Sequence, residues 1–148
     1  MIDLLRYVHR ECLVLLAPAP RDAILRKLVQ VALTGSAEAP ETAPSASLDW
    51  PRLLKDQTLG AGFALSHARV PAGDEIRVSV GLLRPPGAFG RWSDIHTIIC
   101  ALIPEQCARE YLSLMARLAR VLSTPEAEAA FRSSDPDRIL AILRTPPS

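Results

Sequence analysis

A glycine-bounded run in the middle of the chain carries the histidine best placed for chemistry. Residues 60–70 read GAGFALSHARV, so His67 follows two glycines and a short apolar run, and Arg69 follows His67. An imidazole changes charge near pH 6.5 and can act as a nucleophile at neutral pH, while an arginine beside it can hold an anion. The run is therefore either a reactive site or only a turn, and the other segments of the sequence are needed to distinguish these two interpretations.

The composition restricts the class of protein. The chain has 148 residues, of which 49% are apolar, so it can bury a core as one domain spanning 1–148. Seventeen basic and sixteen acidic residues nearly cancel, which gives no electrostatic case for nucleic-acid binding. No apolar run is long enough to cross a bilayer, and none has the layout of a signal peptide. We therefore expect a cytoplasmic protein that neither binds nucleic acid nor inserts into a membrane.

The three cysteines give no sign of a metal site or a disulfide framework. Cys12, Cys100 and Cys107 are an odd number, and no two of them form a CxxC pair. Cys12 and Cys100 lie in apolar runs, as small core residues do. We expect neither a metal nor another cofactor.

Apolar periodicity predicts a chain in which strands and helices are mixed throughout. Short alternating or β-branched apolar runs indicate strands at residues 11–16, 63–65, 75–83 and 95–103. Apolar residues at three- and four-residue steps indicate helices at residues 21–34, 48–57, 104–123 and 136–143, with a further helical turn at 125–131. This mixture predicts an α/β fold, a mixed β-sheet flanked by helices in an α/β/α sandwich.

Three segments of the sequence allow more specific structural predictions. Residues 95–103 are almost continuously apolar, which predicts an interior strand covered on both faces, with His96 as a structural histidine. Residues 36–47 are rich in proline, alanine and serine without an apolar period, which predicts a mobile loop. Residues 84–92 contain two prolines and two glycines and predict a turn-rich connection.

Segments from Thr58 onward match one known pattern in order. Residues 60–69 read GAGFALSHAR, and VSVGLLRPPGAFG, IICALIPEQ and the helical segments after EYLSLM follow. The series resembles the enzyme IIA domain of the bacterial phosphotransferase system, fructose/mannitol type, which includes nitrogen-regulatory proteins. Members carry Gly-x-Gly-x-Ala-x-Pro-His-(Ala/Gly)-(Arg/Thr), and that histidine is phosphorylated. Each motif alone is loose, but the ordered series is fairly specific, and it implies the same mixed sheet flanked by helices.

The resemblance implies a role for His67 and for the residues around it. His67 would accept a phosphoryl group from a histidine-containing phosphocarrier protein, and loop N–H groups and arginines would neutralise it. Arg69 is the first candidate cation, and Arg52 is the second, because the family often has an arginine about sixteen residues before the histidine. The implied catalytic residues are His67, Arg69, Tyr111 and Arg52. The implied phosphate-binding residues are Gly60, Gly62, Thr58 and Ser66.

Three positions depart from the family pattern. Ser66 replaces the proline before the histidine, and Thr58 is the one hydroxyl left in the segment before the glycines. Tyr111 stands where many members have a second active-site histidine. Tyrosine can donate a hydrogen bond to a phosphate, but its pKa of about 10 prevents it from carrying a proton near neutral pH.

Two classes of function remain open. The first is a phosphohistidine transferase that relays phosphate through His67, in a nitrogen-regulatory role or as the IIA component of sugar uptake, where the next partner is a IIB domain. The second is a regulatory binding module of the same fold with a degenerate phosphosite, which acts on a regulated protein. The altered loop, the missing second histidine and the lack of a fused IIB or IIC segment favour regulation over sugar transport.

Overall fold

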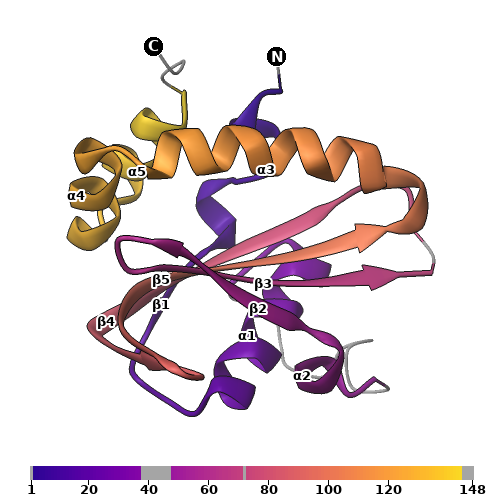
Figure 1. Ribbon diagram of the computed structural model, residues 1–148, viewed down its shortest axis with the longest axis horizontal. Coiled ribbons are helices and arrows are strands. Elements are labelled where there is room, and N and C mark those ends of the chain that lie inside the picture. Colours follow the sequence, from indigo (N-terminus) through magenta and orange to yellow (C-terminus); the bar gives the residue numbers. More distant parts are fainter. Residues whose placement is uncertain (1, 38–47, 72, 145–148) are drawn as a thin grey trace.

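The computed structural model describes residues 2–37, 48–71 and 73–144. A five-stranded sheet separates two helical layers (Figure 1). The strands are β1 (Leu13–Leu16), β2 (Lys55–Gly60), β3 (Phe63–Val70), β4 (Arg77–Phe89) and β5 (Trp92–Pro104). The α-helices are α1 (Arg21–Thr34), α2 (Trp50–Leu53), α3 (Ala108–Leu122), α4 (Pro125–Ser133) and α5 (Pro136–Arg144). Short 3-10 turns lie at η1 (Leu4–Arg6), η2 (Arg10–Cys12) and η4 (Glu105–Cys107).

The sheet is mixed, with the order β1-β4-β5-β3-β2. β1 runs parallel to β4 and β3 parallel to β5, whereas β2–β3 and β4–β5 are antiparallel pairs. The helices α3, α4 and α5 cover one face together with η1, and α1 and α2 cover the other (Figure 1). The predicted mixed sheet flanked by helices is confirmed.

β5 is the central strand, as the sequence predicts. Every residue from Ile95 to Pro104 is buried, and the side chains divide between two cores. Ile99, Ala101 and Ile103 pack under the layer of α3, whereas Ile98, Cys100 and Leu102 pack under that of α1. A strand covered on both faces needs apolar side chains at every position, which explains its unbroken apolar sequence.

The helix ends follow local capping rules. α1 ends at Gly35, whose φ of 76° allows its N–H to bond Val31 O. Thr124 accepts a hydrogen bond from the Ala127 N–H and begins α4, which has Pro125 in its first turn. The predicted helix 21–34 is confirmed in full.

The secondary structure predicted for two segments is wrong. The helix predicted at 48–57 is helical only over Trp50–Leu53, because the chain becomes extended at Leu54 and residues 55–60 pair with β3 as β2. The turn-rich connection predicted at 84–92 is mostly strand. β4 continues to Phe89 with an irregular register, and the hairpin turns at Gly90, where φ is 60°.

The strand predicted at 63–65 is too short. β3 runs to Val70, so His67 lies within a strand rather than at the end of a turn. In the predicted loop 36–47, residues 38–47 lie outside the described residues, and the mobility of that loop and the single-domain boundary stay predictions.

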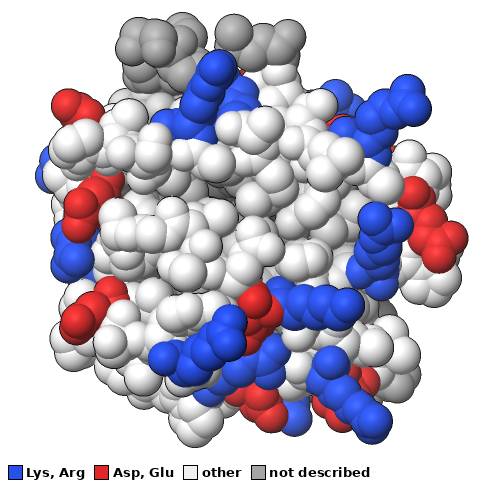
Figure 2. Space-filling model, viewed as in Figure 1, with Lys and Arg blue, Asp and Glu red and all other residues white. Residues whose placement is uncertain are grey.

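The charges on the surface match the near-neutral composition. Figure 2 shows basic and acidic side chains scattered among uncharged residues, without a continuous basic surface on the face in view.

In the part of the chain that the structure describes, no helix is long and apolar enough to span a membrane. Over the same residues, no group of three or more histidine, cysteine or acidic side chains could hold a metal ion.

His96 supports the β2–β3 turn from beneath. It is fully buried, and its Nε2–H donates to the Ala61 carbonyl at 2.8 Å, which leaves Nδ1 to accept from the Thr97 hydroxyl at 2.7 Å. Burial lowers the pKa of His96, in agreement with a neutral ring. The prediction of a structural histidine with satisfied hydrogen bonds is confirmed.

Gly62→Ala should destabilise the fold through this contact. Gly62 and Gly60 both have φ of 84°, but a Cβ on Gly62 would lie 2.4 Å from His96 Cδ2, whereas one on Gly60 meets nothing within 4 Å. We expect Gly60→Ala to cost about 1 kcal/mol of backbone strain and Gly62→Ala roughly 1–3 kcal/mol more, from overpacking. Urea unfolding of both variants measures this difference. Equal losses of stability would contradict the proposed contact.

Candidate functional site

Successive side chains of β3 point to opposite faces of the sheet and so pack in two different layers. Phe63 and Leu65 belong to the core beneath α3, and Ala64 and Ala68 belong to the core beneath α1. Because side chains of a strand alternate between faces, His67 lies on the α3 side, two residues from Leu65. Arg69 follows on the same side.

A small pocket forms where these side chains meet the start of α3. Its volume is about 320 Å³. It is lined by His67, Arg69, Ile103, Ala108, Arg109, Tyr111 and Leu112, here called the His67 pocket. The rings of His67 and Tyr111 lie with centroids 5.9 Å apart at a tilt of 31°. Three of the residues predicted from sequence, His67, Arg69 and Tyr111, are thus brought together.

The chain path explains this meeting. β5 and β3 are parallel neighbours, and Arg69 lies beside Ile103 near the end of β5. Pro104 ends the strand, a single 3-10 turn follows, and α3 then begins at Ala108. The first turn of α3 therefore lies over the end of β3, which places Tyr111 beside His67.

His67 is held as a neutral, partly buried imidazole. Burial is the main cause that lowers its pKa, and the charge of Lys55 lowers it further. The carboxylate of Asp56 opposes this lowering, and Arg69 adds the smallest lowering effect. The ring is therefore unprotonated at one nitrogen at neutral pH. Its Nδ1 is buried and makes no hydrogen bond within the described residues.

Tyr111 is held in its protonated form. Burial raises its pKa to about 12, so the phenol is a hydrogen-bond donor at neutral pH and not a base. This agrees with the limit that the sequence places on Tyr111, which can donate to an anion but cannot replace a histidine as a proton carrier.

Two cations near His67 were not predicted from sequence. Lys55 is the direct partner of His67 in the antiparallel β2–β3 pair, so their side chains share one face. Arg109 lines the His67 pocket from the first turn of α3. Together with Arg69 they give the neutral imidazole three cationic neighbours. Lys55 could have been found only by recognising residues 55–60 as a strand, and Arg109 only from where α3 begins.

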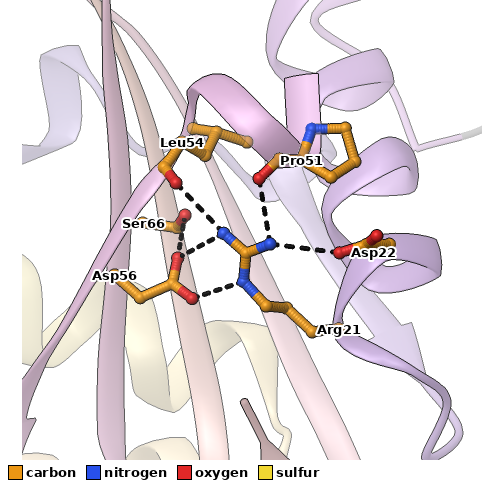
Figure 3. A network of polar contacts seen from close by, with 6 residues as sticks. All are labelled: Arg21, Asp22, Pro51, Leu54, Asp56 and Ser66. Carbon is orange, nitrogen blue, oxygen red and sulfur yellow. Dashed lines mark hydrogen bonds and ion pairs between the residues drawn. The ribbon is translucent and has the colours of Figure 1, made fainter. Parts of the chain in front are cut away.

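Ser66 lies on the wrong face to bind phosphate beside His67. It is fully buried toward α1, and its hydroxyl donates to Asp56 Oδ1 at 2.7 Å. Arg21 pairs with both oxygens of the same carboxylate and also donates to the carbonyls of Pro51 at 2.9 Å and Leu54 at 3.0 Å (Figure 3). Ser66 is therefore part of a structural network, because adjacent residues of a strand point to opposite faces.

Arg52 does not line the His67 pocket. It lies in α2, which packs with α1 on the face opposite α3 (Figure 1). Among the described residues that line the His67 pocket, Arg52 is absent. The structure thus does not bring it to the histidine, contrary to the assignment from the sequence spacing.

The glycines and Thr58 belong to the hairpin turn at the far end of β3. Thr58 Oγ1 accepts from the Gly60 N–H at 3.1 Å and donates to the Phe63 carbonyl at 3.3 Å. Gly62 is five residues from His67, which is about 16 Å along a strand. These residues shape the β2–β3 turn, and the phosphate-binding loop implied by the resemblance is not formed around His67.

Solved structures show which fold this is. The nitrogen regulatory protein IIA-Ntr from Neisseria meningitidis superimposes with a TM-score of 0.72 at 17% identity, covering 90% of this chain and 93% of that one. The mannitol-specific cryptic phosphotransferase enzyme IIA CmtB from Escherichia coli gives a TM-score of 0.64 at 18% identity, covering 97% and 99%. At these identities the likeness shows the fold alone.

The sequence itself carries the family assignment. Comparison with curated proteins finds no match. Residues 56–145, however, match the family described as phosphoenolpyruvate-dependent sugar phosphotransferase system, EIIA 2. That segment is more than half of the chain and holds β3, β5 and α3, the three elements that build the His67 pocket. The protein therefore belongs to the EIIA 2 family of the phosphoenolpyruvate-dependent sugar phosphotransferase system.

Proposed function

We propose that this protein accepts a phosphoryl group on His67 from a histidine-containing phosphocarrier protein, in a nitrogen-regulatory type of role in the cytoplasm. The observation that carries the proposal is a neutral imidazole in a small pocket, with Lys55, Arg69 and Arg109 as cationic neighbours. Phosphoryl transfer depends mainly on positioning and on neutralising the charge of the phosphoryl oxygens, and this arrangement offers both.

The transfer uses one nitrogen of His67. Because Nδ1 is buried, Nε2 is the nitrogen with access to a donor. The Nε2 lone pair forms the new bond to phosphorus while the P–N bond of the carrier's phosphohistidine breaks, and that electron pair returns to the carrier's imidazole. The carrier's ring leaves as a neutral imidazole when its other nitrogen is protonated. His67 keeps its Nδ1 proton during the transfer, so its ring is an imidazolium next to the phosphoryl group until that proton is released to water. The phosphoryl oxygens are then neutralised by the three cations, and Tyr111 can donate a neutral hydrogen bond.

The regulatory role has more support than sugar uptake. Tyr111 replaces the histidine found in many members, and the fold superimposes with a higher TM-score on a nitrogen regulatory protein than on a mannitol-specific IIA. The likeness to the mannitol-specific protein keeps a IIA component of sugar uptake, with a IIB domain as its partner, as an alternative.

A binding module without phosphotransfer is the second candidate. Leu112, at the rim of the His67 pocket, is 70% exposed. A large apolar side chain exposed beside a pocket is a common feature of protein contacts. In this case the surface around His67 would bind a regulated protein, and phosphorylation would be secondary or lost.

His67→Ala should abolish labelling. The protein is incubated with phosphoenolpyruvate, the general phosphotransfer enzyme and its carrier, and its intact mass is measured at neutral pH. The wild type should gain one acid-labile phosphoryl group, and His67→Ala none. His9→Ala is the matched control, because His9 is exposed on a different segment and should leave labelling unchanged. If the wild type stays unlabelled while a known enzyme IIA is labelled, the transferase is excluded and the binding module remains.

Removing a cation should slow the labelling of His67 only when that cation lies on the same face of the sheet as His67. Arg69→Gln and Lys55→Gln should each slow labelling, on the order of 10²-fold for the loss of one positioned charge. Arg52→Gln should have little effect, because α2 lies on the opposite side of the sheet. Labelling rates from a mass time course test this directly. A loss from Arg52→Gln as large as that from Arg69→Gln would show that the spacing in sequence, and not the fold, identifies the cation.

The labelling rate should depend on pH through His67. Only the neutral imidazole attacks, and its folded pKa is lowered by burial and then by Lys55 and Arg69. The labelling rate should therefore stay constant as the pH falls to about 6.5, the ordinary pKa of histidine, and should decrease only at lower pH. Lys55→Gln removes one cause of the lowering, so the His67 pKa should rise. NMR titration of the His67 Cε1–H measures this change, and a shift of the pKa to lower pH in Lys55→Gln would contradict it.

A further inference from the structure

A second and larger hollow lies between α3 and the N-terminal segment that contains η1. The two segments are neighbours in the layer that covers one face of the sheet (Figure 1). Its volume is about 770 Å³. Its charged and polar lining is Arg6, Tyr7, Glu110, Ser113, Arg117 and Arg120, here called the α3 hollow. The residues from α3 recur at three- and four-residue steps and so form one stripe along the helix. Neither Arg69 nor Arg109 lines it, so it is distinct from the His67 pocket.

The α3 hollow carries an excess of positive charge. Three arginines face one carboxylate, that of Glu110. The Tyr7 hydroxyl donates a hydrogen bond to Glu110 Oε2. Burial and this contact raise the pKa of Tyr7 to about 12, so its phenol stays neutral and adds no negative charge. The carboxylate is thus already bonded within the protein, and the three guanidinium groups are left to face the hollow.

These guanidinium groups lack anionic partners. Within the residues that the structure describes, Arg6, Arg117 and Arg120 form no ion pair. Arg6 lies over the ring of Tyr7, 5.9 Å from its centroid. The Nε of Arg117 is buried and has no hydrogen-bond partner among the described residues. The atoms that an anion in the hollow could reach are therefore the terminal nitrogens of these guanidinium groups, which are donors without an ion-pair partner among the described residues.

We propose that the α3 hollow binds a small organic polyanion that carries two or more phosphate or carboxylate groups. Arg117 and Arg120 are one helical turn apart, which suits two anionic groups on one molecule. The planar guanidinium matches both phosphate and carboxylate oxygens with paired hydrogen bonds. With a volume of about 770 Å³, the hollow is large enough to hold a small organic molecule. The proposal stands on residues outside the His67 pocket and does not depend on phosphotransfer.

The test follows the arginine Nε–Hε signals by NMR while pyrophosphate or citrate is added at low ionic strength. We expect saturable shifts at Arg6, Arg117 and Arg120, with a Kd below about 1 mM for at least one probe. Arg117→Gln and Arg120→Gln should each weaken that binding roughly tenfold, the loss of one charge-assisted pair of hydrogen bonds. The tighter probe tells whether phosphate or carboxylate is preferred.

Two controls separate this site from others. Arg26→Gln removes an exposed arginine on α1, on the other face of the sheet, and should leave the Kd unchanged. Arg69→Gln alters the His67 pocket and should leave the shifts at Arg117 and Arg120 in place. The proposal is overturned if neither probe saturates, if shifts occur only at Arg69 and Arg109, or if Arg26→Gln weakens binding as much as Arg117→Gln does.

Discussion

The ion pair between Arg21 and Asp56 fixes how β2 lies against β3, and the surroundings of His67 depend on that pairing. Arg21 reaches from the first turn of α1 to the carboxylate and to two carbonyls before β2 (Figure 3). Asp56 in turn accepts from Ser66 across the pair. With Asp56 and Ser66 on one face, their neighbours Lys55 and His67 must share the other. A slip of one residue would separate the lysine from the histidine.

Most of the fold could be predicted from the sequence because its strongest patterns are local. The almost continuously apolar run at 95–103 predicts a strand covered on both sides, and the helix at 21–34 has an apolar period and a glycine just after its end. β2 could not be predicted in this way. Its sequence, KDQTLG, has one apolar residue in six and lies at the sheet edge, so only its partners, α1 and β3, make it a strand.

The candidate site could be predicted in part. The resemblance led to His67, Arg69 and Tyr111, which the fold does bring together. It failed for Ser66 because neighbours in a strand point to opposite faces, and for Arg52 because a spacing in sequence does not say which side of the sheet a helix covers. Lys55 and Arg109 were missed for the converse reason, since strand pairing places Lys55 beside His67 and the start of α3 places Arg109 in the pocket, and no motif marks either residue.

The three cations around a neutral His67 also determine how a phosphorylated form would differ from the free one. Lys55, Arg69 and Arg109 give the free surface a local charge of about +3, counting one for each side chain. A phosphoryl group brings about −1.5 to −2 at neutral pH, so roughly half to two thirds of that local charge would be cancelled without any movement of the backbone. A charged partner could thus distinguish the two forms by its rate of approach, and this discrimination would weaken as salt screens the field.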